Sequence, residues 1–174
     1  MNTRLLYRTI GALVLLVSVS GASAADMAVA GITNAEGTDI GSVTFRQAPA
    51  GVLISVDVTE LPPGGHGIHL HAVGSCSPDF KASGGHVNPN GVPHGLLNPG
   101  GGDSGDLPNL HAAADGSARA EFFTTRVSLK GGDLPALLDA DGSAVIIHDS
   151  PDDHTTQPIG GAGGRIACGV IEGM

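Results

Sequence analysis

Three histidines lie within six residues of the chain, in the stretch GGHGIHLHAVGSC: they are His66, His69 and His71. Successive side chains of a β-strand point to opposite faces, so His69 and His71 share a face, with Cα atoms about 6.6–6.8 Å apart. Two imidazoles at that spacing can converge on one metal ion, although a merely polar strand face would show the same pattern. By the same alternation His66 faces the other way and is not expected to join them.

Other residues of metal-ligand type follow in the chain. His86 and His94 precede Asp103 and Asp106, and His148 ends the apolar run AVIIH, where a strand would present a rigid ligand. Imidazole suits copper and zinc, and a carboxylate can complete a zinc site. The combined set favours a metal centre over a polar strand face.

The segments that must position these residues are of β type. Short runs of β-branched and apolar residues are separated by Gly, Pro and Asp-Gly turns, which predicts an antiparallel sandwich or barrel. We find no convincing helical periodicity after residue 25, and no internal repeat or second domain. The expected strands are 27–33, 41–47, 52–61, 66–73, 118–129, 143–148 and 165–171.

Two loops interrupt this pattern. Residues 74–110 are rich in Gly, Pro, Asn and Asp, show no strand pattern, and carry most of the candidate ligands. A loop of this length inside a compact domain is commonly functional or disordered, and its His and Asp content favours function. A shorter loop spans residues 149–164.

The first 24 residues have the order of a secretory signal peptide. Arg4 and Arg8 precede an apolar core from Ile10 to Val19, and small residues end the segment at Ala24. The apolar run is short for a spanning helix, which needs about 20 residues, and an uncleaved membrane anchor is the alternative. Cleavage after Ala24 leaves one domain over residues 25–174. We expect an exported protein of the periplasm, with full secretion as the alternative.

Charge excludes two classes of partner. Without Arg4 and Arg8, six basic residues stand against seventeen acidic ones, a net charge of −11 with neutral histidine. Nucleic acids and anionic membranes both attract basic surfaces, so neither is an expected partner of the processed chain.

The chain has two cysteines, Cys76 and Cys168. An even count in an exported protein favours one disulfide over two free thiols. The bond would close a loop of about 90 residues, which the chain-entropy model values at roughly 4–5 kcal/mol.

Over nearly all of residues 25–174 the chain resembles the secreted bacterial copper/zinc superoxide dismutases. The resemblance implies an all-β fold, an eight-stranded antiparallel Greek-key barrel or sandwich with long metal-binding and substrate-guiding loops. Its most specific segments are GGHGIHLHAVGSC, GGHVNPNGVPHG, SGDLPNL, VIIHDSPDD and GGAGGRIACGVI.

The resemblance also implies the metal ligands. Zinc would share His86 with copper and would further bind His94 and Asp106. The copper ligands would be His69, His71, His86 and His148.

Further roles follow from the same resemblance. Asp152 would link a copper histidine to a zinc histidine. Arg165 would hold the anionic substrate beside copper and His86 would carry a proton to the product, so these two are the expected catalytic residues. Cys76 and Cys168 would form the family disulfide.

The three remaining histidines downstream of the signal segment match no ligand of the family. His66 is expected to form structural hydrogen bonds, His111 to lie on a strand or strand edge, and His154 to be a solvated loop residue.

One position departs from the family pattern. The family reads His-x-Gly-Asp before LPNL, whereas this chain has Asp103-Ser104-Gly105-Asp106. Asp103 therefore stands where the third zinc histidine is expected, and its shorter side chain requires the loop to come closer. Three outcomes stay open: zinc bound by two histidines and two aspartates, weaker zinc with water filling a position, or no zinc.

The activity implied is the conversion of superoxide to dioxygen and hydrogen peroxide, with copper cycling between Cu(II) and Cu(I). The alternative is a periplasmic copper-binding or copper-buffering protein on the same fold with little turnover. Arg165 favours the enzyme, because a storage site has no evident need of that cation. Whether the chain is a monomer or a homodimer stays open.

Overall fold

The structure, a computed structural model, describes residues 26–174, so the predicted signal peptide and its cleavage point lie outside the described residues. Within that range the chain forms ten strands and one short 3-10 helix. In chain order they are β1 Met27–Asn34, β2 Asp39–Ala48, β3 Gly51–Val58, β4 Gly64–His66, β5 Ile68–His71, η1 Phe80–Ser83, β6 Leu110–Ala112, β7 Ala118–Thr124, β8 Ala144–His148, β9 Arg165–Val170 and β10 Glu172–Gly173.

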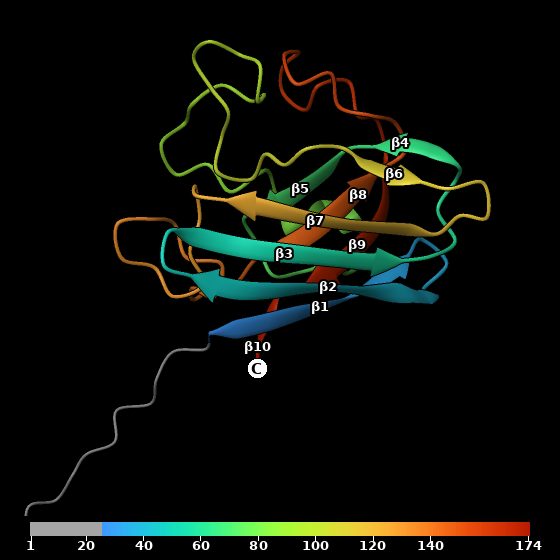
Figure 1. Ribbon diagram of the computed structural model, residues 1–174, viewed down its shortest axis with the longest axis horizontal. Helices are drawn as coiled ribbons and strands as arrows, with labels where there is room; N and C mark the ends of the chain where they lie inside the picture. Colours follow the sequence, from blue (N-terminus) through green and yellow to red (C-terminus); the bar gives the residue numbers. More distant parts are fainter. Residues whose placement is uncertain (1–25) are drawn as a thin grey trace, which may run out of the picture.

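Eight strands form one curled antiparallel sheet in the order β5-β8-β9-β1-β2-β3-β7, with β10 paired to β1. Several neighbours are far apart in sequence, such as β3 with β7 and β5 with β8, as Greek-key connections require. In Figure 1, β1, β2, β3 and β7 lie in front of β5, β8 and β9, while the short β4–β6 ribbon lies at one end. The all-β Greek-key prediction is confirmed.

The core lies between these two faces. Along β3 the side chains of Ile54, Val56 and Val58 are buried and the residues between them are more exposed, as the strand period of two requires. Phe45 of β2 stands opposite Ile54 in the register and is fully buried. In β5 and β8 every residue is buried.

Three predicted strands end elsewhere than expected. The segment 52–61 stops at Val58, and the segment 66–73 divides at Gly67, whose amide donates to the Ser150 carbonyl in the second loop. The segment 118–129 ends at Thr124. Val127 and Leu129 are still buried, so their apolar character reflects burial in a loop and not strand pairing.

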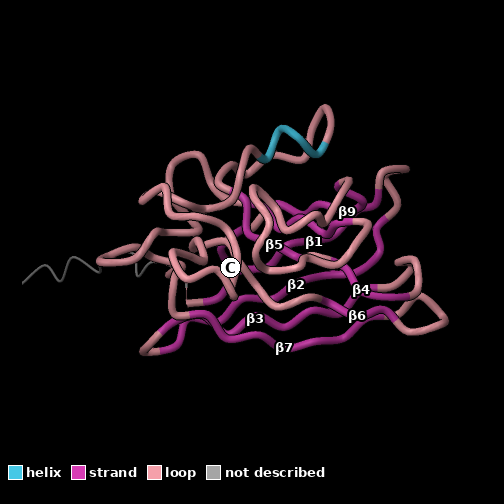
Figure 2. Tube along the Cα trace, turned by 90° about the horizontal axis from the view of Figure 1, so that it is seen from above, coloured by secondary structure: helices cyan, strands magenta, loops and turns pink. Residues whose placement is uncertain are grey.

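The first long loop contains regular structure that the sequence pattern did not indicate. It contains η1, drawn in cyan in Figure 2, and its last residue begins β6. It also pairs with the edge strand β5: the Leu70 amide donates to the Gly105 carbonyl at 2.9 Å, and the Val87 amide to the Leu70 carbonyl at 2.8 Å. A Cβ at Gly105 would lie 2.3 Å from the Leu70 carbonyl oxygen, so only glycine permits this approach. The pairing brings His86 and Asp106 beside β5.

Residues 26–174 contain no helix that is long and apolar enough to span a membrane.

Candidate metal centre

Four histidine rings meet where the first loop lies against β5 and β8. The ring centroids of His69 and His86 are 4.2 Å apart, and those of His69 and His148 are 4.9 Å apart. His71 joins the cluster with its ring centroid 5.1 Å from that of His86. The structure therefore brings together the four residues for which copper binding was predicted, and the strand alternation that placed His69 beside His71 holds.

Each of the four rings presents one buried nitrogen that has no hydrogen-bond partner. These atoms are Nδ1 of His69 and Nε2 of His71, His86 and His148. Four unpaired imidazole nitrogens in one buried cluster are costly unless something binds them, and imidazole is a preferred copper ligand. The residues fit a copper ion.

Hydrogen bonds fix the tautomers of three of these rings. His69 donates from Nε2 to Asp152 Oδ2 (2.9 Å), His71 from Nδ1 to the Gly84 carbonyl (2.9 Å), and His148 from Nδ1 to the Gly163 carbonyl (3.2 Å). Because carboxylate and carbonyl oxygens only accept, the proton sits on the bonded nitrogen and the lone pair is left on the nitrogen that faces the cluster.

Burial keeps these imidazoles neutral. Desolvation lowers the pKa of His71 to about 2 and that of His148 to about 4, with neighbouring histidines adding to the effect, and it also lowers the pKa of His69. Neutral imidazole is the form that binds a metal.

These pKa shifts predict how the stability of the metal-free protein depends on pH. Below pH 6.5, His71 and His148 bind protons in the unfolded chain but stay neutral in the folded state. The free energy of unfolding should therefore fall by about 1.4 kcal/mol per pH unit for each group as the pH drops toward 4. His86 has a raised pKa, so its contribution is present below pH 6.5 and is lost as pH rises toward 9.

Urea unfolding of the metal-free, disulfide-intact protein across pH 4.5–9 would measure this dependence. Maximum stability is expected near pH 6.5, with the acid side steeper than the alkaline side. His71→Gln should reduce the acid slope by about 1.4 kcal/mol per pH unit. A flat profile between pH 4.5 and 6.5 would contradict the expectation.

A second cluster lies on the other side of His86. His86, His94, Asp103 and Asp106 each offer a ligand atom, and these atoms all lie within 4.8 Å of one another. Nδ1 of His86 is 3.0 Å from Asp103 Oδ2, and Nδ1 of His94 is 2.6 Å from Asp106 Oδ1. Two imidazoles and two carboxylates at this range form a donor set suited to tetrahedral zinc.

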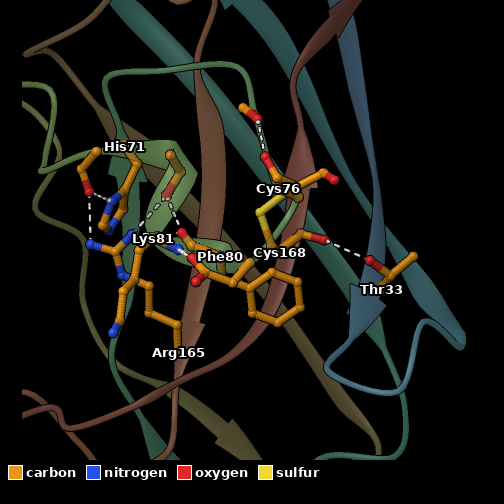
Figure 3. The surroundings of a disulfide bond; sticks show 12 residues. Thr33, His71, Cys76, Phe80, Lys81, Arg165 and Cys168 are labelled. Carbon is orange, nitrogen blue, oxygen red and sulfur yellow. Dashed lines mark hydrogen bonds between the residues drawn. A yellow bond between two sulfur atoms is a disulfide. The ribbon is translucent and has the colours of Figure 1, made fainter.

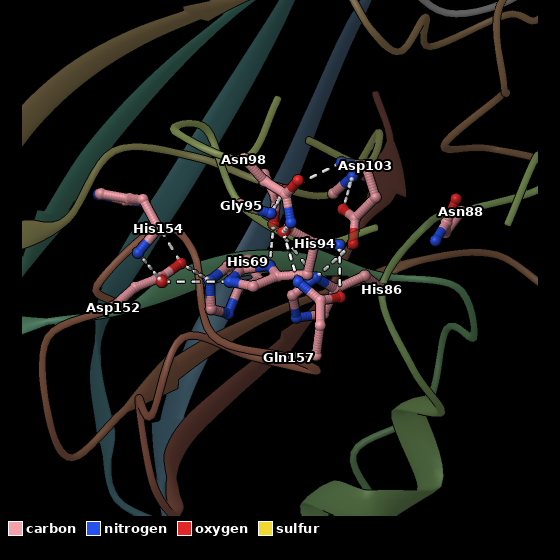
Figure 4. Close-up of polar contacts among 12 residues, drawn as sticks. His69, His86, Asn88, His94, Gly95, Asn98, Asp103, Asp152, His154 and Gln157 are labelled. Atoms are coloured by element: carbon pink, nitrogen blue, oxygen red, sulfur yellow. Dashed lines mark hydrogen bonds and ion pairs between the residues drawn. The ribbon is translucent and has the colours of Figure 1, made fainter. Parts of the chain in front are cut away.

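Asp103 reaches this cluster despite its short side chain. It is buried, and its Oδ1 accepts from the Gly105 amide at 2.9 Å while Oδ2 faces His86. Asp106 is held in the same way, since its Oδ2 accepts from the amides of Gly95 and Asp103 at 2.7 and 2.9 Å. Figure 4 shows His94 and Asp103 converging with His86. The loop comes close enough because Gly105 packs against β5.

The two carboxylates dominate the electrostatics of His86. Burial alone would lower the pKa of this imidazole, but hydrogen bonds and charge from Asp103 and Asp106 outweigh burial and raise the pKa to about 9. The two carboxylates would also attract a cation to the Nδ1 side of the His86 ring.

Asp152 links the two clusters. Its Oδ2 accepts from Nε2 of His69 at 2.9 Å and its Oδ1 from Nε2 of His94 at 3.1 Å (Figure 4). Burial would raise the pKa of this carboxyl group, but the bonds from His69, from the His154 backbone and from His94 hold it below its ordinary value. Asn109 clamps the backbone: its Oδ1 accepts from the Asp152 amide and its Nδ2 donates to the Asp152 carbonyl, each at 2.8 Å. The contact predicted for Asp152 is present.

Arg165 begins β9 and points toward His71 (Figure 3). Its guanidinium donates to the Phe80 carbonyl at 2.6 Å, to Ser83 Oγ at 3.0 Å and to the Gly84 carbonyl at 2.7 Å. A cavity of about 400 Å³ is lined by Arg165 together with His71, His86 and other residues of both loops. The fixed cation therefore shares a small cavity with two of the four clustered histidines, His71 and His86.

A disulfide joins Cys76 to Cys168 with a Cα–Cα distance of 5.9 Å, as predicted (Figure 3). Cys76 and Phe80 pack against the buried Cys168. The bond thus attaches the segment that holds Arg165 to the strand from which Arg165 projects.

The comparisons with known proteins agree with this geometry. Residues 40–171 match the family model described as copper/zinc superoxide dismutase (SODC). The chain belongs to the copper/zinc superoxide dismutase family. Membership in this family implies copper and zinc as cofactors, and the chain offers one cluster of ligand atoms for each metal.

Individual proteins of known sequence or structure show the same similarity. A protein of Caulobacter vibrioides named Cu-Zn superoxide dismutase is 55% identical over 148 residues, covering 83% of this chain and 85% of the relative. Among solved structures, a double mutant of a SOD-like protein from Bacillus subtilis has a TM-score of 0.79 at 41% identity, covering 83% of this chain and 97% of that one. The Cu/Zn superoxide dismutase from Brucella abortus has a TM-score of 0.70 at 32% identity, covering 84% and 99%.

The histidines outside the family ligand set have distinct places. His66 is buried in β4, with its ring nitrogens each 2.7 Å from the carbonyls of His148 and Pro62, which agrees with a structural role. His111 is exposed on the short ribbon strand β6. The expectation that His154 is solvated was wrong: its side chain is 18% exposed and lies against Asp152, because the second loop folds back over that carboxylate.

Sequence reasoning missed Asn109 and the acceptors of Arg165. Asn109 lies in the motif LPNL, but the motif does not reveal that its amide meets a residue of the other loop. The Arg165 acceptors at Phe80 and Gly84 are backbone carbonyls, which carry no signal in residue type.

Proposed function

We propose that the chain is a superoxide dismutase that acts on superoxide in the periplasm, with copper held by the four-histidine cluster. The observation that carries the proposal is the cluster of four unpaired ring nitrogens, two of whose histidines, His71 and His86, line one cavity together with Arg165. Copper, when bound, supplies the one-electron redox chemistry that turns two superoxide ions into dioxygen and hydrogen peroxide.

The protein residues supply binding and protons. Arg165 carries a permanent charge, and its three anchoring bonds keep it oriented beside the histidines, where it can hold an anion. His86 faces both clusters, so its Nε2 can hold a proton for the product while its Nδ1 stays among the carboxylates.

The second cluster supports the proposal that zinc is bound by His86, His94, Asp103 and Asp106. Each carboxylate has one oxygen held by backbone amides and the other turned toward a histidine, so neither has to be reoriented to bind zinc. Of the three outcomes left open by the sequence, we favour zinc bound by two histidines and two aspartates.

Superoxide decay, followed with the copper- and zinc-loaded protein lacking residues 1–24, tests the function. Arg165→Ala is expected to slow the decay about 10- to 100-fold, because a charge-assisted hydrogen bond of about 1.5–3 kcal/mol to the anion is lost. Arg165→Lys keeps the charge without the fork of donors and should fall between the two.

Copper content measured on each variant is the control, since the hydrogen bonds of Arg165 go to Phe80, Ser83 and Gly84 and not to the histidine rings. Equal rates for the parent and Arg165→Ala at equal copper content would contradict the role of the arginine. Bound copper with no superoxide decay in the parent would favour the copper-buffering alternative.

A further inference from the structure

Five buried side-chain nitrogens or oxygens in residues 26–174 have no hydrogen-bond partner, and four of them face the copper position. The fifth is Nδ1 of His154. It does not face a cluster of histidines. It lies 3.4 Å from Asp152 Oδ2, the oxygen that accepts from His69. The fifth unpaired atom therefore lies beside the carboxylate that links the two metal clusters.

The tautomer of His154 follows from Asn109. The Asp152 amide can only donate, so the Asn109 atom that receives it is the oxygen Oδ1, and the other terminal atom is the amide nitrogen Nδ2. This Nδ2 donates to the Asp152 carbonyl and lies 3.3 Å from Nε2 of His154. Nε2 is therefore the acceptor of the ring, and the proton of a neutral His154 sits on Nδ1, facing the carboxylate.

His154 meets Asp152 through two donors. Its backbone amide donates to Oδ1 at 2.6 Å, and its Nδ1–H faces Oδ2 at 3.4 Å, longer than an ordinary hydrogen bond but effective as an electrostatic contact with a buried carboxylate. Each oxygen of Asp152 is thus flanked by one metal-cluster histidine and one donor of His154: His94 and the amide at Oδ1, His69 and the ring at Oδ2. Figure 4 shows this arrangement at its left side.

Contacts with the first loop hold the backbone of His154 in an unusual conformation. Its φ is +61°, a left-handed conformation that costs most side chains energy. The carbonyl accepts from the Leu97 amide at 3.0 Å and packs against Gly95, where a Cβ would lie 2.2 Å from the carbonyl oxygen. Strain of this kind persists only when the surroundings hold the residue in place, and here they hold it over Asp152.

We propose that His154 is a positioning residue whose Nδ1–H, together with its backbone amide, holds the Asp152 carboxylate in the orientation that aligns His69 and His94. The proposal rests on the proposed function of the two clusters as copper and zinc sites. Outer hydrogen-bond partners of metal ligands commonly change metal affinity 10- to 100-fold when removed.

Two substitutions separate the side-chain donor from the backbone conformation. In His154→Asn the side-chain amide nitrogen takes the place of Nδ1, and asparagine tolerates a positive φ. In His154→Gly the positive φ is tolerated and the donor is absent. We expect His154→Gly to lower zinc affinity about tenfold in a chelator competition, and His154→Asn to stay within about threefold of the parent. The visible and EPR spectra of the Cu(II) protein should shift in His154→Gly and be restored in His154→Asn, because His69 is turned by the same carboxylate.

A measurement of the histidine tautomers, which does not depend on enzymatic activity, completes the test. Long-range ¹⁵N–¹H correlation spectra of the metal-loaded, reduced protein report which nitrogen of each histidine carries the proton, and Nδ1–H is expected for His154. An Nε2–H tautomer, or equal losses of zinc affinity in the glycine and asparagine variants, would overturn the proposal. A parent that binds both metals but does not consume superoxide would overturn the proposed function alone, because the tautomer and the ranking of the two variants do not depend on catalysis.

Discussion

The double variant Cys76→Ser/Cys168→Ser is expected to unfold with a free energy roughly 4–5 kcal/mol below that of the parent, because the chain-entropy model assigns that value to the loop closed by this disulfide. The two cysteines are 92 residues apart in sequence, and Cys168 lies buried in the centre of β9. Urea unfolding of the metal-free proteins at pH 7 would measure the difference. The parent treated with a thiol reductant is the matched control and should lose a similar amount.

A loss below about 1 kcal/mol in both samples would contradict the entropic estimate, since it would mean that the unfolded chain is not restricted by the bond. The same variant should lose superoxide turnover more than zinc affinity. The disulfide anchors the segment that holds Arg165, whereas the zinc cluster is held to β5 by its own backbone pairing.

The second large effect is expected at the position that departs from the family pattern. Asp103→Asn should lower zinc affinity at least about 100-fold, because it replaces an anionic ligand with a weak neutral one of the same shape. The loss of a ligand should exceed the 10- to 100-fold effect of losing a hydrogen-bond partner of a ligand. Chelator competition on the copper-loaded protein measures the affinity. Asp133→Asn, which changes an exposed aspartate far along the chain, is the charge-matched control.

Zinc binding in Asp103→Asn that equals the parent would show that Asp103 is not a ligand. The variant Asp103→His restores the residue expected from the family, and it should keep zinc bound. If it bound zinc far more tightly than the parent, the carboxylate would be the cause of a weakened site.

The position of His69 beside His71 was predictable because it depends on a short-range rule, whereas the ligands in the first loop were assigned only from the family resemblance. Strand alternation alone places His69 and His71 on one face, and the continuous burial of β8 explains why His148 ends an apolar run. His66 was also correctly set apart, although the break at Gly67 and not alternation along one strand separates it from His69.

The missed features depend on contacts between distant segments. Strand β6 forms because residues 110–112, at the end of the first loop, meet β4, and β7 stops at Thr124 although Val127 and Leu129 continue the apolar alternation. His154 reads as a polar residue in a polar loop, and only the fold shows that the loop turns its ring onto Asp152. Residue type and spacing do not report which loop covers which carboxylate.

The Gly84 carbonyl has two roles that cannot be adjusted separately. It accepts from Nδ1 of His71 at 2.9 Å and from the guanidinium of Arg165 at 2.7 Å. A shift of this one peptide group would therefore act both on His71, a proposed copper ligand, and on Arg165, the proposed anion-binding cation. Because Arg165 also donates to the Phe80 carbonyl and to Ser83 Oγ in the same segment, residues 80–84 couple the position of the cation to that of His71.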